Sequence, residues 1–496
     1  MTELPLTDPT AVDRLGADLR AADFSAEGVP SHLGRSAHHA LGRGEWAPAL
    51  RATRDGSPLA TLVRLFLLGT AEPAAAVARA LPGLGVADGI AAGVLEAHGD
   101  RIRAALDVRP HADDESDFLV ISDLDSDTRP GPVRRDHVLG IGAASITLAN
   151  AIIREPVGSV LDLGTGCGIQ ALHCYSHAES VVATDTNPRA LALAAATARL
   201  NGQHWDLRQG SLFEPVAGER FDLIVSNPPF VIGGGDQRYL YRDSGIAGDG
   251  ICRALVGGMA DRLTEGGTAQ LLANWMITDR QDWRSRVGEW LAPGGLDAWV
   301  VQREVADPAE YVALWLKDAG EQEAFTVADA WLDYFEAERV TGIGMGLITL
   351  RRSGSDRPDV VLDEIGGAGE VVTGPEAAAF LARRRWVRDT GDAELLATRL
   401  SLADTVYLEH RAIPSAEKGW LPVLRMLRRP GGPGATLQVD EWGQSLLAGC
   451  TGQAPLSLLL DLLAQANGFD VQALTDAVLP SIRDGITRGL LHPVGG

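Results

Sequence analysis

The sequence of 496 residues contains little cysteine. Its four cysteines, Cys167, Cys174, Cys252 and Cys450, form no Cys-x-x-Cys pair and no other spacing typical of a metal site. Reduced, buried thiols are the ordinary state of such cysteines in a cytosolic protein. We therefore predict a chain with no disulfide framework and no metal centre.

Targeting and membrane signals are also missing. The first residues, MTELPLTDPTAV, carry acids and prolines where a signal peptide has a basic region and an apolar core. The longest apolar runs, residues 59–69 and 454–466, are short and are interrupted by Arg64 and Asp461. Neither run is long enough to cross a bilayer. We expect a soluble, cytoplasmic protein without a membrane partner.

The chain also lacks an excess of positive charge. Its formal net charge of −22 argues against broad, non-specific binding to phosphate backbones, although a local basic patch stays possible. A hydrophobic fraction of 45% with 22% charged residues is typical of globular proteins. The length predicts about three structural units. Internal repeats and low-complexity tracts are absent, and the sequence does not indicate an oligomeric state.

The central stretch, residues 159–230, contains three motifs whose order is informative. In the first, the apolar run Val160–Leu163 leads into Gly164-Thr165-Gly166-Cys167-Gly168 and then into a helical pattern. Glycines at a strand-to-helix turn let the backbone approach a ligand closely. Dinucleotide enzymes use a related turn, but with the spacing G-x-G-x-x-G, which this chain does not have.

The second motif is the short apolar run Val181–Asp185, which ends in an acid. A carboxylate at the end of the next parallel strand can accept hydrogen bonds from two ribose hydroxyls. Asp185 could instead cap the helix that starts near Pro188. Asn187 is better placed for that cap, which leaves Asp185 free for a ligand.

The third motif is the predicted strand Phe221–Ser226 followed by Asn227-Pro228-Pro229-Phe230. Two prolines directly after a central strand stop the ladder and fix a rigid turn. The Asn227 side chain and the Pro228 carbonyl would offer two acceptors to a planar amine or amide, with Phe230 beside them. Ordinary loops often contain two adjacent prolines, but such a loop is unlikely directly after this strand and downstream of the other two motifs.

Together, DLGTGCG, ATDTNPRAL and GSLFEPVAGERFDLIVSNPPF resemble the class I S-adenosylmethionine-dependent methyltransferases. More narrowly, they resemble the NPPY/NPPF branch, which holds release-factor glutamine methyltransferases, adenine amino-methyltransferases and ribosomal guanine amino-methyltransferases. The resemblance covers residues 131–352 and implies S-adenosyl-L-methionine as the cofactor. It also implies an α/β fold with a doubly wound, seven-stranded Rossmann-like sheet whose last strands pair antiparallel. The strands are expected at Val160–Leu163, Val181–Asp185, Trp205–Arg208, Phe221–Ser226, Thr268–Asn274, Ala298–Arg303 and Ile343–Arg351.

The resemblance also implies which residues form the site. The donor would be held by Asp162, Gly164, Thr165, Gly166, Gly168, Asp185, Thr186, Ser211, Leu212 and Asn227. Catalysis would rest on Asn227, Pro228 and Phe230. At position 211 relatives often carry an acidic residue that binds the adenine amino group, so here a hydroxyl or the backbone must make that contact.

The resemblance also bears on four other segments of this domain. The family has a segment at residues 137–147 that closes over the methionine part of the donor, and Gly233–Gly235 suggests a hinge for a lid. Asp249-Gly250 resembles a step found in glutamine methyltransferases. Trp275, at the end of the fifth strand, is expected to pack in the core and not to catalyse.

The regions on either side of this domain are expected to be mainly helical and winged-helix-like, which gives three domains: 1–130, 131–353 and 360–496. The first should contain short helices, including one at 86–98 that is poor in lysine and arginine, and a two-stranded ribbon made by 102–111 and 117–123. The last should contain helices at 375–387, 454–467 and 470–491 and a strand pair at 405–413 and 434–442. Its arginines at 383–385, 425, 428 and 429 are expected to be a solvated face more than an RNA or acidic-partner site.

Four functions remain open from the sequence. The leading hypothesis is methylation of a protein glutamine amide, with a translation factor as one candidate partner. The close rival is methylation of a nucleobase amino group in RNA or DNA. A tailoring enzyme for a small molecule or peptide, and a donor-binding scaffold without activity, are the other two.

Overall fold

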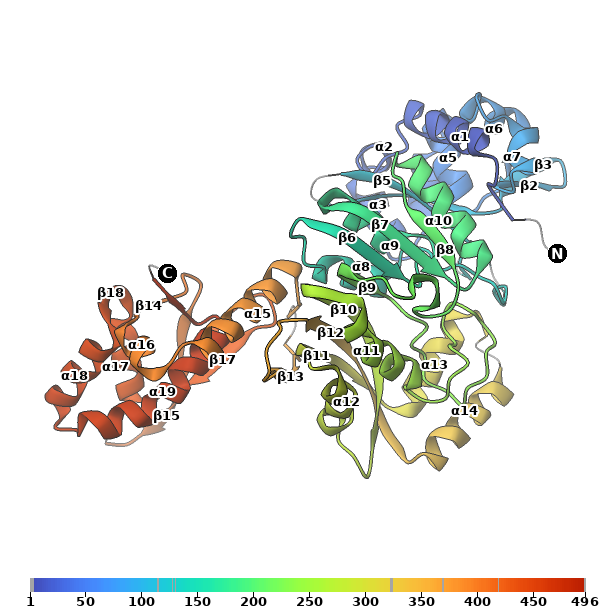
Figure 1. The fold of residues 1–496 in the computed structure, drawn as a ribbon. Helices are drawn as coiled ribbons and strands as arrows, with labels where there is room; N and C mark the ends of the chain where they lie inside the picture. The colour runs from blue at the N-terminus through green and yellow to red at the C-terminus, as the bar shows by residue number, and fades with distance from the viewer. Residues whose placement is uncertain are drawn as a thin grey trace. The chain divides into compact units, whose positions relative to one another are not determined.

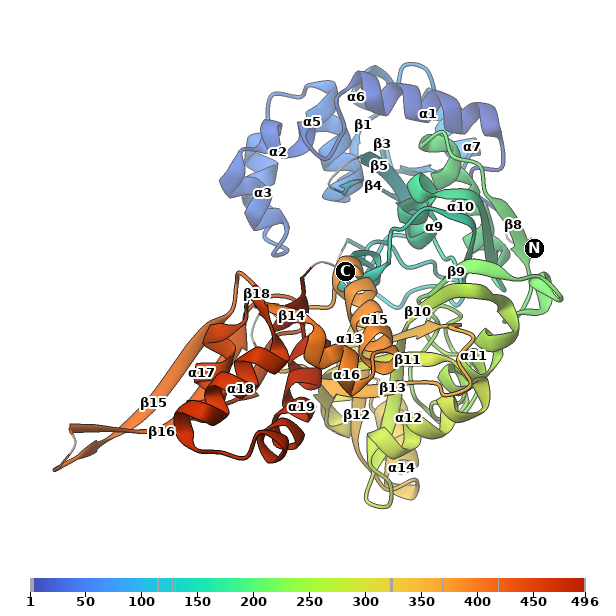
Figure 2. The ribbon, with the colours of Figure 1, turned by 60° about the vertical axis from the view of Figure 1, so that its left-hand side comes forward.

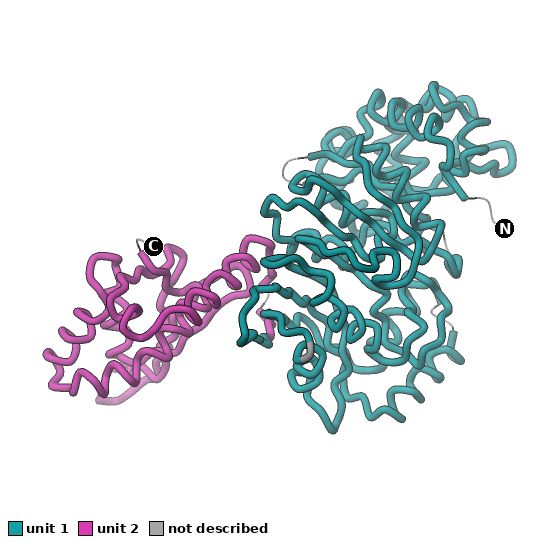
Figure 3. Tube along the Cα trace, viewed as in Figure 1, with its two compact units in different colours: residues 1–363 teal, residues 364–496 magenta. Residues whose placement is uncertain are grey.

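The computed structural model describes residues 4–113, 116–126, 128–129, 131–321, 324–367, 370–417 and 419–494 (Figure 1). The chain forms two compact units, residues 1–363 and 364–496 (Figure 3). The predicted boundary at residue 130 lies outside the described residues, and the division into three domains stays a prediction. Among the described helices, none has both the length and the hydrophobicity that crossing a bilayer requires.

Unit 1 contains an eight-stranded sheet with the order β13-β11-β12-β10-β9-β6-β7-β8. Its strands are β6 (Val157–Leu163), β7 (Ala178–Asp185), β8 (Asp206–Gln209), β9 (Phe221–Ser226), β10 (Leu263–Thr278), β11 (Asp297–Ala306), β12 (Val340–Arg351) and β13 (Val360–Glu364). The strands from β8 to β10 pair in parallel, whereas β12 pairs antiparallel with both β10 and β11. All seven predicted strands and the late antiparallel pairing are confirmed. The eighth strand, β13, was not predicted.

The central strands are buried on both faces, as parallel strands covered by helices must be. Helices that connect or flank the strands are α8 (Ala143–Ala151), α9 (Ile169–Cys174), α10 (Pro188–Leu200), α11 (Gly250–Arg262), α12 (Trp283–Leu291), α13 (Pro308–Asp318) and α14 (Phe325–Ala337). On β6, Val160 packs in a cluster with Ala171 of α9, and its neighbour Leu161 packs in another with Leu255 of α11. Alternate side chains of one strand therefore hold a different helix on each face.

The N-terminal helices of unit 1 share a hydrophobic core with the helices that flank the sheet. These N-terminal elements are α1 (Pro9–Ala21), α2 (Gly28–Leu33), α3 (Arg35–Leu41), α4 (Ala47–Ala52), α5 (Pro58–Leu62), a π-helical turn (Val63–Leu67), α6 (Ala74–Ala80) and α7 (Val86–Ala91). Leu15 and Leu19 of α1 lie in one buried cluster with Leu193 and Leu200 of α10. The Arg20 guanidinium also donates to the Leu200 carbonyl at 3.0 Å. This region is thus packed onto the sheet domain.

The N-terminal region also contains two short sheets, and they correct two predictions. Strands β1 (Glu72–Pro73), β2 (Leu95–His98) and β3 (Arg101–Ala104) form one sheet, and β4 (Asp107–Ala112) pairs with β5 (Asp117–Ser122) in another. The predicted helix 86–98 is wrong beyond Ala91, because Gly93 adopts a φ of +73° that ends the helix and starts a hairpin. The run 102–111 is two strands and not one. The likeness to a winged helix stays a prediction.

Unit 2 combines five helices with two three-stranded sheets in its described residues. The helices are α15 (Gly374–Asp389), α16 (Asp392–Ala397), α17 (Glu441–Gly449), α18 (Leu456–Asn467) and α19 (Val471–Thr487). The strands are β14 (Arg399–Leu402), β15 (Tyr407–Ser415), β16 (Gly419–Arg429), β17 (Ala435–Gln438), β18 (Thr451–Pro455) and β19 (Leu491–Pro493). Figure 2 shows β15 and β16 as a long hairpin that extends from the helices of the unit.

The strand pair expected between 405–413 and 434–442 is wrong in its pairing. Strand β16 lies between β15 and β17 and pairs with both. It escaped prediction because Pro422 interrupts its pattern, and proline is normally excluded from the middle of a sheet. In the structure the β15–β16 register shifts next to this proline, between Arg411 and Ala412.

Candidate active site

A cavity of about 430 Å³ opens at the carboxyl ends of β6, β7 and β9. Ligands bind at this place in doubly wound sheets. Nine of the predicted site residues line the cavity: Gly164, Thr165, Gly166, Asp185, Thr186, Ser211, Leu212, Asn227 and Pro228. The other three, Asp162, Gly168 and Phe230, do not belong to the lining.

The glycine loop after β6 is shaped by its backbone. Gly164 and Gly166 have φ angles of +77° and +55°, which disfavour any other residue, and a Cβ added at either would meet no atom within 4 Å. The N–H groups of Gly164 and Thr165 both donate to the Thr184 carbonyl at 2.9 Å, which ties the loop to β7. The loop is therefore fixed while its inner surface stays open to a ligand.

Gly168 serves a different purpose. A Cβ at this position would lie 2.5 Å from the ring of Trp205. Because glycine has no Cβ, the start of α9 can pack closely against that ring. A direct contact between Gly168 and a ligand stays a prediction.

Asp162 lies behind the glycine loop and is fully buried. Its Oδ2 accepts hydrogen bonds from the Thr165 hydroxyl at 2.7 Å and from the Ala171 N–H at 3.0 Å, while its Oδ1 has no hydrogen-bond partner in the described structure. Burial raises the pKa of this carboxyl from 3.8 to about 7. Asp162 thus holds the loop to the start of α9.

Asp185 occupies the end of β7, on the wall of the cavity. Its two oxygens accept the N–H groups of Gly166 at 3.0 Å and Asn187 at 2.8 Å. Burial raises the pKa of its carboxyl above the ordinary value. Asn187 caps α10 by accepting the Arg189 N–H at 3.0 Å, which confirms the prediction that the cap is not Asp185. Each Asp185 oxygen keeps a lone pair for a further donor.

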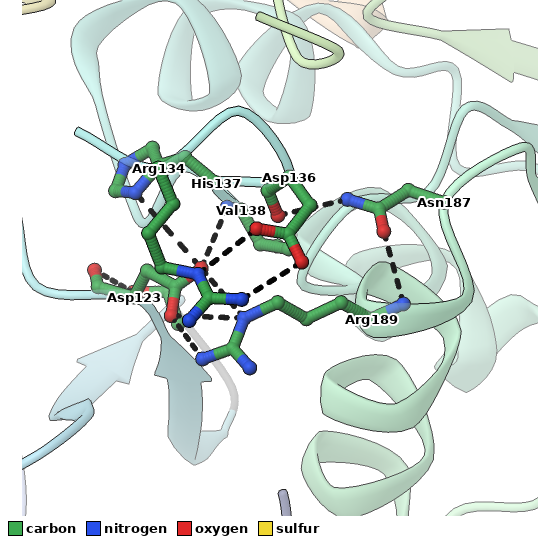
Figure 4. A network of polar contacts seen from close by, with 8 residues as sticks. Asp123, Arg134, Asp136, His137, Val138, Asn187 and Arg189 are labelled. Carbon is green, nitrogen blue, oxygen red and sulfur yellow. Dashed lines mark hydrogen bonds and ion pairs between the residues drawn. The ribbon is translucent and has the colours of Figure 1, made fainter. Parts of the chain in front are cut away.

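A strap (residues 136–142) forms part of the cavity wall and is anchored by polar contacts (Figure 4). Asp123, at the end of β5, accepts the Val138 N–H at 2.9 Å and pairs with the Arg189 guanidinium at 3.0 Å. The Asn187 amide donates to the Asp136 carbonyl at 3.0 Å. The strap contributes His137, Val138, Leu139, Gly140 and Gly142 to the lining. It thus connects the N-terminal region, the helix α10 and the cavity.

The end of β9 supplies the polar groups opposite the glycine loop. The Ser226 hydroxyl donates to the Leu163 carbonyl at 2.7 Å, so the ends of β9 and β6 are tied together. Asn227 and Pro228 follow and face the cavity. The Pro228 carbonyl accepts the Phe230 N–H at 2.7 Å and keeps its second lone pair.

Phe230 points to a different neighbour. Its ring meets the ring of Trp315 edge to face, with centroids 6.1 Å apart. It therefore supports the turn after β9 from outside the cavity lining, and stacking on a substrate stays a prediction.

The 231–249 loop closes the far side of the cavity. Arg242, whose side chain is 1% exposed, donates to the Trp315 carbonyl at 2.5 Å and lies over the rings of Tyr239 and Trp331 at 4.7 and 5.4 Å. The Asp243 carboxylate accepts the Tyr239 N–H at 2.9 Å. The loop is thus held against α13 and α14 by side chains, and the hinge at its glycines stays a prediction.

This loop brings four residues into the lining, Gln237, Leu240, Tyr241 and Ser244. The Tyr241 hydroxyl donates to Asp318 at 2.6 Å, and its ring meets His137 of the strap edge to face at 5.4 Å. Burial raises the pKa of Tyr241 above its ordinary value and lowers the pKa of His137, so in both side chains burial favours the neutral form.

Two residues near the cavity have structural roles. Asp249 pairs with Arg286 and accepts the Met276 N–H at 3.0 Å, so it joins α11 to α12 and β10 and does not line the cavity. Trp275 is fully buried, donates to Gln302 at 2.9 Å and stacks on Trp283. The prediction that Trp275 packs is confirmed. The described cysteines are likewise all free and buried, as predicted.

Comparisons with known proteins agree with this geometry. The family model "Methyltransferase small domain" matches residues 139–281. A putative protein N5-glutamine methyltransferase of Methanocaldococcus jannaschii is 30% identical over 143 residues, which are 28% of this chain and 72% of that relative. The chain belongs to the class I S-adenosylmethionine-dependent methyltransferases.

Two other relatives from the same family are similar over shorter shares of their length. A release factor glutamine methyltransferase of Xylella fastidiosa is 40% identical over 128 residues, 23% of this chain and 46% of its own length. A ribosomal RNA small subunit methyltransferase C of Citrobacter koseri is 32% identical over 156 residues, 31% of this chain and 41% of its own length. The chain therefore spans less than half of these methyltransferases.

Outside the methyltransferase region, two family models match residues 21–105 and 378–493. Both are described as domains of unknown function, DUF7059 and DUF7782. The methyltransferase family thus accounts for the cavity, and the flanking regions have their own families.

Proposed function

We propose that the chain is an S-adenosylmethionine-dependent N-methyltransferase whose acceptor is a planar amide or amino nitrogen. The observation that carries this proposal is that Asn227 and Pro228 line the same cavity as Gly164, Gly166 and Asp185. One cavity thus offers both a surface suited to an adenosine-containing ligand and a pair of hydrogen-bond acceptors.

The described residues fit the donor. Asp185 would accept hydrogen bonds from the ribose hydroxyls, and the open backbone of Gly164 and Gly166 would receive the methionine end. Ser211 or the neighbouring backbone would meet the adenine, and the strap would cover the ligand. The bound donor supplies a methyl group on a sulfonium sulfur.

The acceptor nitrogen needs help from the protein, because the lone pair of an amide or aniline-like nitrogen is delocalised. The Asn227 side-chain oxygen and the free lone pair of the Pro228 carbonyl would each accept one of its N–H groups. These contacts would draw the nitrogen towards a pyramidal geometry and orient its lone pair. Positioning of this kind supplies most of the catalysis in an in-line displacement, and a strong general base is not required.

Among acceptors, we propose a protein glutamine side chain. The support is the name of the two glutamine methyltransferase relatives and the net charge of −22, which disfavours a nucleic-acid partner. Three arginines of unit 2 also favour a protein acceptor. Arg383 and Arg429 both pair with Glu376, and Arg428 pairs with Glu409, so these cations are already matched by acids. We also propose a cytoplasmic setting, where thiols stay reduced.

A nucleobase amino group in RNA is the second candidate. It is supported by the relatives named ribosomal RNA small subunit methyltransferase C. It would require the nucleobase to leave its stack to reach Asn227.

Labelling separates the two. The protein is incubated with donor carrying a radioactive methyl group and with cell lysate, and the labelled fraction is digested with protease or with nuclease. Label that protease releases and nuclease spares supports a protein acceptor, and hydrolysis should then yield N5-methylglutamine. Label that nuclease releases would overturn the glutamine proposal.

A further inference from the structure

Unit 2 contains a groove that the methyltransferase cavity does not explain. It has a volume of about 820 Å³ and lies between β16, the end of β17, α17 and α19. Its walls are mainly apolar, with Leu446 and Val478 below and Trp442 and Phe469 at the rim. The two rim rings meet edge to face at 5.4 Å and are 36% and 39% exposed. Apolar surface of this kind on a folded domain is typical of an interaction site.

One wall of the groove is the edge of a β-sheet. Strand β17 pairs only with Met426–Arg429 of β16, and the Val439 N–H closes this pairing on the Arg425 carbonyl. From Arg425 back to Gly419, β16 extends past the end of β17 while β15 pairs with its other side. Residues 422–425 of this extension line the groove. The groove thus runs beside a sheet edge that its own sheet does not cover.

The exposed edge is also apolar. Trp420 is 70% exposed, and Val423 is 54% exposed. Exposed apolar edge strands are liabilities, which proteins normally cover or protect with charges. Pro422 gives some protection, but the rest of this edge is suited to accepting another strand.

One charge in the groove lacks a partner. Arg425 lines it, its Nε is buried, and within the described part of the chain no hydrogen bond or ion pair to its guanidinium is found. The nearby Arg428 and Arg429 are paired with acids. A buried N–H group without an acceptor is costly, and a carboxylate would match the Arg425 guanidinium with two parallel hydrogen bonds.

We propose that this groove binds an extended peptide segment of a partner protein, which adds as a strand to the free edge of β16. The segment carries apolar side chains at alternate positions, which face the groove, and one carboxylate, which pairs with Arg425. Strand addition gains affinity from main-chain hydrogen bonds and specificity from pockets for alternate side chains. A helix could fill the groove but would leave the edge unpaired. A second copy of β16 would bring Trp420–Arg425, which contains no carboxylate.

The test selects short random peptides, displayed on phage, against the full-length chain. Selected peptides are synthesised with a fluorescent label, and their affinity is measured by fluorescence anisotropy. We expect alternating apolar residues with an acidic residue among them. Ala477→Trp, which fills the groove from α19, should weaken binding at least tenfold. The matched variant Ala466→Trp, exposed on α18 outside the lining, should leave it unchanged.

Charge exchange tests the carboxylate. Arg425→Glu should weaken binding of the acidic peptide about tenfold, and a peptide with lysine in place of its acid should recover affinity for that variant. In Ala477→Trp and in Arg425→Glu, the affinity of unit 1 for the donor and the thermal unfolding midpoint should stay unchanged.

Three results would overturn the proposal. One is a selected set with apolar residues spaced three and four apart, which indicates a helical occupant. Another is binding that Ala477→Trp and Arg425→Glu do not affect. The last is a dimer in sedimentation experiments that Ala477→Trp dissociates, since the occupant would then be a second copy of the chain.

Discussion

The two sides of the methyltransferase cavity are built in different ways. The donor side consists of the glycine loop and Asp185, and its shape comes from main-chain angles and from hydrogen bonds made within residues 162–187, most of them donated by main-chain N–H groups. The acceptor side consists of Asn227, Pro228 and the 231–249 loop, and the loop is held by side chains that reach α13 and α14. A family can therefore keep the first side unchanged while packing changes reshape the second.

Asn227→Ala is the strongest test of whether the acceptor side can be changed without changing the donor side. The variant removes one of the two acceptors proposed for the substrate N–H groups but changes no main-chain angle of the donor side. We expect the methylation rate to fall by about 10²–10³-fold, with the dissociation constant of the donor nearly unchanged. The rate is measured with labelled donor, and donor binding is measured by calorimetry.

Two outcomes would contradict this assignment. Methylation at the parental rate would remove Asn227 from catalysis. A loss of donor affinity as large as the loss of rate would place Asn227 on the donor side.

Arg242→Met tests whether side chains hold the acceptor side. The buried guanidinium joins the 231–249 loop to Trp315 and Trp331, so its removal should loosen the loop. We expect the KM for the labelled acceptor to rise about tenfold, which corresponds to about 1.4 kcal/mol. The donor dissociation constant should not change. Arg238→Met is the matched control, because Arg238 belongs to the same loop but is 41% exposed.

Gly166→Ala tests the main-chain character of the donor side. An added Cβ meets no neighbouring atom, but a φ of +55° should cost about 1 kcal/mol for alanine. Gly218→Ala is a matched control, since Gly218 also has a positive φ and an open Cβ position but lies outside the cavity lining. Both variants should lose similar stability in urea unfolding. Only Gly166→Ala should weaken donor binding, by about fivefold to tenfold.

The last prediction concerns pH and Asp162, and it needs no change to either side of the cavity. Because its pKa is raised to about 7, the folded chain keeps a proton that the unfolded chain releases above its ordinary pKa of 3.8. Its contribution to the free energy of unfolding should therefore decrease as pH rises from 4 to 7, by about 1.4 kcal/mol per pH unit at most, and then stay constant. Urea unfolding of the donor-free chain across this range is compared with Asp162→Asn. A parallel decrease in both proteins would show that Asp162 does not titrate there.

The same contrast explains which parts of the site were predictable from sequence. Gly164 and Gly166 come just after β6 and Asp185 ends β7, so the sheet order alone brings them to one edge. Phe230 is also next to a strand, but its place outside the cavity lining depends on its contact with Trp315, which lies far along the chain. The contribution of Gln237 and Ser244 depends on how the 231–249 loop folds against α13 and α14. No local pattern encodes such packing.

Fold prediction had a similar limit. Most strands of the large sheet are apolar runs between clear turns, and seven of its eight strands were predicted. Strand β13 follows a polar segment that reads as a linker, and β16 contains Pro422. In unit 2 the pairing of β15 could not be predicted, because its hairpin partner is β16, which the sequence pattern does not indicate.

The core that α1 shares with α10 has a consequence for how this protein can change over evolutionary time. Leu15 and Leu193 belong to one buried cluster that spans both regions, so removing the N-terminal helices would expose an apolar face on the methyltransferase fold. The region is therefore not an exchangeable attachment. An insertion, deletion or swap at this end would have to be matched by substitutions on α10, next to Asp185 in the chain. Substitutions tolerated in the N-terminal helices should thus depend on the residues present on α10.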